Sequence, residues 1–87
     1  MPTAFVLVNT DMKSENAVLR ALKKIDSVIE AYNLYGTYDI IAKIEAERMG
    51  ELTEIVTWRI RKIDGVRSTL TMVVSDETTK AVHAPTG

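Results

Sequence analysis

The sequence contains no cysteine and a single histidine, His83, among its 87 residues. Without cysteine the chain has no disulfide, no thiol nucleophile and no thiolate metal ligand. His83 lies beside Pro85 near the C-terminus, so one chain cannot assemble a histidine metal site or a histidine relay for a nucleophile. The lack of cysteine is typical of proteins of the reducing cytosol, and we expect a cytoplasmic location.

An excess of positive charge is also lacking. The 11 Lys and Arg residues and 12 Asp and Glu residues give a formal net charge of −1. Since phosphate binding is driven by positive charge and counterion release, we expect no direct contact with nucleic acid. No apolar run approaches the ~20 residues of a membrane helix, and no basic segment precedes the first apolar run, so we expect no membrane insertion.

Motifs of catalysis are missing as well. The glycines are widely spaced along the chain, so there is no Gly-rich phosphate loop. The carboxylates occur in polar segments, where charge is usually solvated, and none stands in an apolar setting that would raise its pKa for acid catalysis. We therefore expect no catalytic residue, no metal and no cofactor.

What is present is an alternation of strand and helix periodicities. Residues 4–9 are rich in β-formers and predict a first strand. From Ser14 onward the apolar residues fall at helical spacing, which predicts a first helix with Ser14 as its cap. Residues 28–35 and 39–46 predict two strands, and the short link containing Gly36 makes them an antiparallel hairpin.

The second half of the chain repeats this order. Helical spacing returns between Glu51 and Gly65, and residues 66–74 predict the last strand. LKKIDSV at residues 22–28 matches IRKIDGV at residues 60–66, which indicates two copies of a βαβ unit. We predict an α+β, ferredoxin-like βαββαβ domain over residues 1–75, with a four-stranded antiparallel sheet, both helices on one face, and a polar tail over 76–87.

The face opposite the helices is expected to be unusually apolar for a solvated surface. By strict alternation, Ile40, Ala42 and Ile44 of the third strand face the helices. The same rule assigns Val66, Leu70, Met72 and Val74 of the last strand to the helices, and Arg67, Thr69, Thr71 and Val73 to the opposite face. A half-solvated sheet is one interpretation. We favour a homodimer whose sheets pair face to face.

The segment VIEAYNLYGTYDIIAKIEA, followed by IRKIDGV and RSTLTMVV, resembles the effector domain of the Lrp/AsnC regulators, called the RAM domain. The family pattern is a strand, Gly-x-Tyr-Asp, a strand, a helix, a Gly-Val turn and a strand with alternate threonines. The resemblance spans residues 4 to about 74 and is specific as an ensemble. The matching residues are Gly36, Tyr38, Asp39, Gly65, Val66, Thr69 and Thr71.

The resemblance implies a dimeric α+β barrel that assembles further into a ring, an octamer or decamer, with an amino acid or similar small metabolite bound between dimers near the hairpin loop. The residue types agree. Gly36 allows backbone amides to approach a ligand, Asp39 suits an α-ammonium group, and tyrosines offer flat walls with a polar tip. The candidate ligand-binding residues are Tyr35, Gly36, Thr37, Tyr38, Asp39, Thr69 and Thr71.

Several alternatives stay open. The same loop residues would also serve a simple hairpin turn, with Gly36 required by its φ angle and Asp39 bonded to its own backbone. Full-length family members begin with a helix-turn-helix unit that this sequence lacks, so the resemblance implies a stand-alone effector half. Such a chain would respond to a ligand through its assembly or partners, or act as an adaptor that co-assembles with full-length Lrp/AsnC regulators. A cofactor-free dimeric α+β barrel enzyme is the remaining option.

Overall fold

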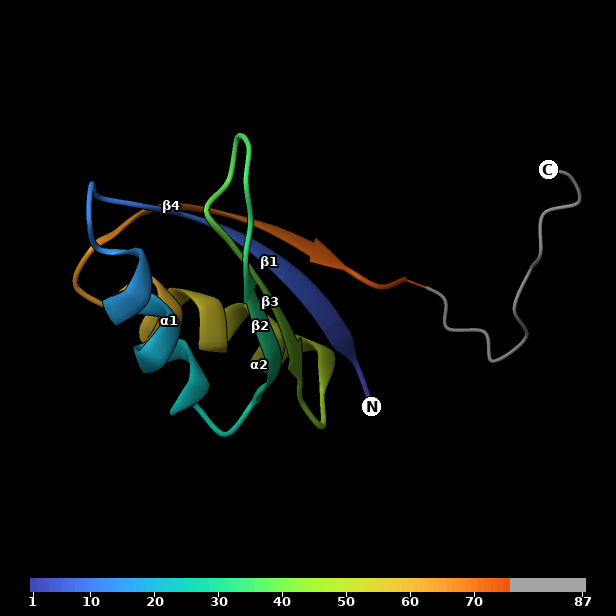
Figure 1. Ribbon diagram of the computed structural model, residues 1–87. Coiled ribbons are helices and arrows are strands. Elements are labelled where there is room, and N and C mark those ends of the chain that lie inside the picture. Colours follow the sequence, from blue (N-terminus) through green and yellow to red (C-terminus); the bar gives the residue numbers. More distant parts are fainter. Residues whose placement is uncertain (76–87) are drawn as a thin grey trace, which may run out of the picture.

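The computed structural model describes residues 1–75, and Figure 1 shows their path from the N-terminus, in blue, to the last strand, in orange. The elements in chain order are β1 (Thr3–Thr10), α1 (Glu15–Lys23), β2 (Val28–Asn33), β3 (Ile40–Glu45), α2 (Met49–Ile55), a π-helical turn (Val56–Ile60) and β4 (Val66–Val73). This order confirms the predicted βαββαβ plan. The predicted tail over 76–87, with His83, lies outside the described residues.

The four strands form one antiparallel sheet in the order β2-β3-β1-β4. Both helices lie on the same side of this sheet, and the link between β2 and β3 projects beyond its end (Figure 1). Within residues 1–75, no helix has the length and apolar character needed to cross a membrane. The result is a two-layer α+β domain that leaves one face of the sheet without a helix.

The core lies between the helices and the sheet. Residues of β1 and β3 alternate along each strand between buried and half-buried, as expected for strands with one face against a core. This confirms the predicted inward orientation of Ile40, Ala42 and Ile44. The fully buried aliphatic side chains, each stabilising the fold by about 1.5–3 kcal/mol, include Val6, Val8, Val18, Leu22, Ile40, Ile44, Leu52 and Ile60.

The internal repeat is visible in the backbone hydrogen bonds. After α1, the amide of Ile25 donates to the carbonyl of Leu22 and the amide of Val28 to the carbonyl of Ile25, both at 3.0 Å. The second copy makes the equivalent bonds from Ile63 to Ile60 at 3.1 Å and from Val66 to Ile63 at 3.2 Å. Both copies thus leave the helix through the same pair of tight turns, with a buried or half-buried isoleucine at the centre.

The second helix differs from a regular α-helix in its last turn. The amide of Arg61 donates to the carbonyl of Val56 at 2.9 Å, which is the i→i+5 bond of a π-turn. The buried residues Leu52, Val56 and Ile60 are four apart, whereas an α-helix completes a turn in 3.6 residues. The wider turn keeps all three side chains on the core side and leaves Trp58 exposed on the outer side.

A β-bulge changes the register between β1 and β4. Asn9 pairs with Ser68 but Thr10 pairs with Val66, so Arg67 is an extra residue without a partner on β1. Val66, which precedes the bulge, packs against the core. Each residue after Arg67 lies on the face opposite to the one that unbroken alternation predicts.

The predicted orientation of β4 is therefore wrong beyond Val66. Leu70 pairs with Leu7 and Met72 pairs with Phe5, and directly paired residues share one face of a sheet, so these side chains lie on the face without helices. Thr69, Thr71 and Val73 pair with Val8, Val6 and Ala4 and lie on the helix side.

The start of α1 also differs from the prediction. Ser14 occupies the N-cap position, but its hydroxyl makes no capping hydrogen bond. The backbone holds this corner instead, since the Ser14 amide donates to Asp11 at 2.9 Å and the Asp11 amide donates to Gly65 at 2.7 Å. The first helix is thereby tied to the beginning of β4.

Candidate functional site

The candidate site begins with the link between β2 and β3, residues 34–39, which is longer than the predicted turn because both strands are shorter. The amide of Leu34 donates to the carbonyl of Asp39 at 2.8 Å, and this bond closes the loop. Gly36 has φ of +132°, which L side chains rarely adopt, although an added Cβ would meet no atom within 4 Å. Gly36 is therefore required for conformation and not for space, and Tyr35 beside it is fully exposed.

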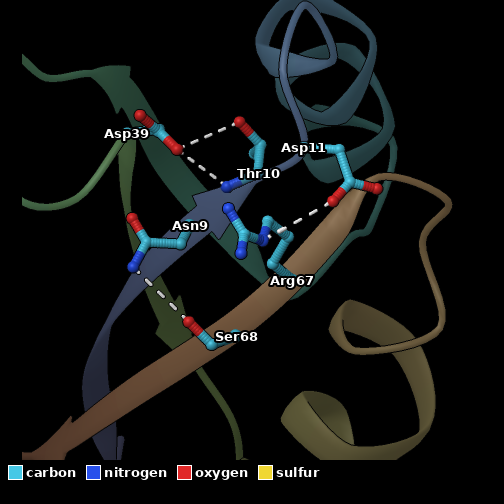
Figure 2. A network of polar contacts seen from close by, with 6 residues as sticks. All are labelled: Asn9, Thr10, Asp11, Asp39, Arg67 and Ser68. Atoms are coloured by element: carbon cyan, nitrogen blue, oxygen red, sulfur yellow. Dashed lines mark hydrogen bonds and ion pairs between the residues drawn. The ribbon is translucent and has the colours of Figure 1, made fainter.

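Asp39 anchors the loop to the end of β1. Its Oδ2 accepts hydrogen bonds from the amide of Thr10 at 2.7 Å and from the Thr10 hydroxyl at 3.1 Å (Figure 2). Its own amide donates to the carbonyl of Val8 at 2.9 Å. Within residues 1–75, Oδ1 accepts no hydrogen bond, so one oxygen of this half-buried carboxylate stays available to a ligand.

Two hollows flank Asp39. The larger has a volume of about 530 Å³, and the second, about 380 Å³, lies on the β1–β4 side. Both fall in the range of roughly 300–1,000 Å³ typical of small-molecule sites. The first is lined by Glu15, Asn16, Asn33, Leu34, Tyr35, Gly36 and Asp39, and the second by Asn9, Thr10, Thr37, Asp39, Arg67 and Ser68.

The second hollow carries a polar network that the sequence alone did not identify. Arg67 Nε lies 3.7 Å from Asp11 Oδ1, and Asn9 Nδ2 donates to Ser68 Oγ at 3.4 Å (Figure 2). Arg67 reaches this position because the bulge gives it no partner on β1. Unbroken alternation assigned Arg67 to a face of the sheet and gave no reason to place it beside the hairpin loop.

The structure brings part of the predicted site together. Tyr35, Gly36 and Asp39 line the larger hollow, while Thr37 joins Asp39 in the smaller one. Tyr38 is half-buried and lines neither hollow. Thr69 and Thr71 lie on the helix side of β4 and line neither hollow of this copy.

The face of the sheet without helices carries a row of apolar side chains that crosses all four strands. Leu7 pairs with both Leu70 and Ile41, and Ile41 pairs with Tyr32. We call this row, together with the neighbouring Phe5 and Met72, the open sheet face. Leu70 and Met72 are each 46% exposed, which is high for strand residues of their size.

Tyr32 at the end of this row has a polar partner. Its hydroxyl donates to Glu30 Oε1 at 2.8 Å. This hydrogen bond, followed by the negative charge of Glu30, raises the pKa of Tyr32 above its ordinary value, because both favour the protonated phenol. The phenol therefore stays neutral at physiological pH, and its ring extends the apolar row.

No group of three or more histidine, aspartate or glutamate side chains that could hold a metal ion occurs in residues 1–75. The buried polar residues of that region are Thr3 and Thr10, and the layer between helices and sheet is otherwise aliphatic. The polar groups instead gather at the end of the sheet, around Asp39.

The described residues form a ferredoxin-like α+β domain with one sheet face left uncovered and a polar hollow beside its central hairpin. The family model described as the Lrp/AsnC ligand binding domain matches residues 3–82. The chain belongs to this family, as the resemblance in the loop and last strand predicted.

Relatives of this chain include HTH-type regulators and an enzyme. An HTH-type transcriptional regulator of Pyrococcus furiosus is 38% identical over 74 residues, which cover 82% of this chain and 49% of the regulator. The homocitrate synthase of Sulfurisphaera tokodaii is 45% identical over 58 residues, covering 67% of this chain but only 12% of the enzyme. This chain thus spans about half the length of the regulators it matches.

Solved structures show the same fold. The crystal structure of FFRP-DM1 is 38% identical with a TM-score of 0.82, and the match covers 85% of this chain and 99% of that one. A protein of Thermus thermophilus is 30% identical with a TM-score of 0.87, covering 92% and 100% of the two chains. AsnC of E. coli is 25% identical with a TM-score of 0.83, and the match covers 94% of this chain and 56% of AsnC.

Proposed function

We propose that this chain binds an amino acid or a similar small metabolite beside the loop from Gly36 to Asp39 and acts as an effector module of the Lrp/AsnC type. The observation that supports this most directly is the carboxylate of Asp39, which is held by Thr10 and has one oxygen free between two hollows within the described residues. An oriented carboxylate with an unused oxygen suits the α-ammonium group of an amino acid.

The proposal includes a dimer formed through the open sheet face. Leu70 and Leu7 lie at the centre of an apolar row that residues 1–75 leave uncovered, and removing such a row from water stabilises an association by about 25 cal/mol per Å² before the costs of binding. A domain of this size gains from the added burial, because its own core is small.

The site is proposed to be complete only in an oligomer. Thr69 and Thr71 lie on β4 of the same copy but away from both hollows, so they are expected to reach a ligand only from a neighbouring copy. A ligand bound at a junction between dimers in a ring would contact them there. Such a junction also gives ligand binding a way to change assembly, because the ligand would contact more than one chain.

The test is a thermal-shift screen of the purified chain with the standard L-amino acids at millimolar concentration. We expect at least one to raise the melting temperature, since a ligand that binds only the folded state stabilises it by RT ln(1 + [L]/Kd). Asp39→Asn should reduce the shift by weakening affinity about 10-fold or more, because it removes the charge that pairs with the ammonium group.

The matched control is Glu54→Gln, which also removes one carboxylate. Glu54 is an exposed residue of α2 and borders a different hollow, together with Glu45 at the opposite end of β3 from Asp39. This variant should leave the shift unchanged. A protein whose melting temperature is moved by none of the amino acids would contradict the proposal. If the ligand shifts the melting temperature equally in the wild type and in Asp39→Asn, then Asp39 does not contribute to binding.

The output of the module is proposed to lie in another chain or another domain. Related segments occur in HTH-type regulators and within a homocitrate synthase, so the same kind of domain accompanies different activities. We favour a regulatory role over catalysis for this chain, because the matched family is a ligand-binding domain and the layer between helices and sheet is aliphatic within residues 1–75.

An adaptor role is the second candidate, because this chain and an HTH-type regulator share this domain at 38% identity over 74 residues. If this chain co-assembles with such a regulator, mixing the two should produce oligomers that contain both. Native mass spectrometry of the mixture with the Pyrococcus furiosus relative would detect them. Exclusively separate oligomers after prolonged incubation would argue against the adaptor.

A further inference from the structure

Arg67 has a position that stability alone does not explain. It is the extra residue of the β-bulge, its side chain is 68% exposed, and its contact to Asp11 is an exposed ion pair at 3.7 Å. Such pairs contribute between about 0 and 1 kcal/mol to stability. The bulge, by contrast, re-aims one side chain of a strand, and here it turns a guanidinium toward the end of β1.

The smaller hollow beside the loop contains two opposite charges. Asp39 contributes a carboxylate and Arg67 a guanidinium, and the remaining lining groups are the neutral amide and hydroxyls of Asn9, Thr10, Thr37 and Ser68. The larger hollow is different, because its charged lining residues, Glu15 and Asp39, are both acidic. Among the described residues that line either hollow, Arg67 is the one cation.

We propose that Arg67 is the residue that recognises the carboxylate of the ligand, so that the hollow selects small molecules with a free carboxylate over their neutral amides. The inference rests on the proposed binding at the Gly36–Asp39 loop and adds the group that receives the acid end. A guanidinium offers five donors in a planar fork and binds a carboxylate through two parallel hydrogen bonds. Asp11 contacts only the Nε atom, at 3.7 Å, so the terminal nitrogens of Arg67 stay available to a ligand.

The arrangement predicts recognition of both ends of an α-amino acid. Asp39, at the end of the hairpin loop, would take the ammonium group, and Arg67 of β4 the carboxylate; β1 lies between β3 and β4 in the sheet. The Asp39 carboxylate is held by Thr10 of β1, and the bulge places the backbone of Arg67 beside the same end of β1. A ligand that lacks either charge would leave one of these groups unpaired.

The test compares each standard L-amino acid with its α-amide on the full chain. For an acid that shifts the melting temperature of the wild type, titration calorimetry should give an affinity at least about 10-fold above that of its amide. In Arg67→Gln the affinity for the acid should fall by about 10- to 100-fold to that of the amide, and the amide should bind as before. Arg67→Lys keeps the charge but lacks the planar fork, so its affinity for the acid should lie between those of the wild type and Arg67→Gln.

Arg67→Gln also breaks the contact to Asp11, so Asp11→Asn is the matched control. It removes the same ion pair but keeps the guanidinium, and it should retain the preference for the acid. Circular dichroism would verify that each variant is folded, as expected for exposed positions. If the wild type binds an amino acid and Arg67→Gln keeps the acid-to-amide ratio, the role of Arg67 is overturned while binding at the loop stands. If the wild type binds none, the binding proposal falls, and the role of Arg67 falls with it.

Discussion

Gly65→Ala is expected to lower the free energy of unfolding by about 3 kcal/mol, a large part of the stability of a domain of this size. Gly65 has φ of +96°, where an L side chain costs about 1–3 kcal/mol. An added Cβ would also lie 2.8 Å from Ser14 Cβ and 3.1 Å from Val18 Cγ2. Val18 is fully buried, so the crowding has no easy relief and adds a cost of about 1–3 kcal/mol.

The other two described glycines serve as matched controls. Gly36 has a positive φ but no atom within 4 Å of an added Cβ, so Gly36→Ala should cost only the backbone strain of about 1–3 kcal/mol, without a crowding cost. Gly50 lies in α2 with neither constraint, and Gly50→Ala should leave stability unchanged or raise it by up to about 1 kcal/mol. Urea unfolding followed by circular dichroism at one protein concentration measures all three. Equal losses for Gly65→Ala and Gly36→Ala would show that contact with α1 contributes nothing.

The Gly65 contact also bears on the site. The carbonyl of Gly65 accepts from the amide of Asp11 at 2.7 Å, and Asp11 in turn contacts Arg67. The close approach of Gly65 to Ser14 thus positions the start of β4 against the corner that leads from β1 to α1. A side chain at residue 65 would displace the bulge that carries Arg67, so Gly65→Ala should weaken ligand binding as well as folding.

Most of the fold could be predicted from local patterns. The alternation of β3 was correct because its residues 40–45 pair without interruption with β1. The repeat around Ile25 and Ile63 was also informative, since both copies make the same turn hydrogen bonds. These features depend on contacts close in sequence or on an unbroken alternation of period two, and both can be recognised in one amino-acid sequence.

The orientation of β4 could not be predicted in the same way. Its faces depend on a single extra residue, Arg67, and a bulge has no periodicity of its own. A one-residue shift moves each later side chain to the other face, so Leu70 and Met72 were assigned to the core and instead lie on the open sheet face. The pattern of polar and apolar residues in β4 does not reveal the shift, because both kinds of side chain occur on both of its faces.

Of the candidate site, the sequence predicted only the residues that belong to the local motif. The Gly-x-Tyr-Asp pattern identified Gly36 and Asp39, and the structure places both beside a hollow. It did not identify Thr10, which holds the Asp39 carboxylate, or Arg67, which lines the smaller hollow with it. Both lie far from Asp39 in the sequence and approach it only through the pairing of β1 with its two neighbouring strands.

Leu70→Lys is expected to convert the proposed dimer into folded monomers, and it tests the corrected orientation of β4 together with that dimer. Leu70 pairs with Leu7 at the centre of the apolar row and is 46% exposed in the single chain. A two-fold interface would bury two lysines without partners, and burying an unpaired charge is costly enough to weaken association by about 100-fold or more. The single chain loses little, because the side chain stays in water.

Sedimentation or light scattering measures the outcome directly, since a monomer has a mass of 9.7 kDa. Thr53→Lys, which adds the same charge to an exposed residue of α2, should keep the oligomer of the wild type. A folded Leu70→Lys monomer would support the sheet-to-sheet dimer. An unfolded variant would mean that the single chain needs the dimer to stay folded, and an unchanged mass would place the contact between copies on another surface.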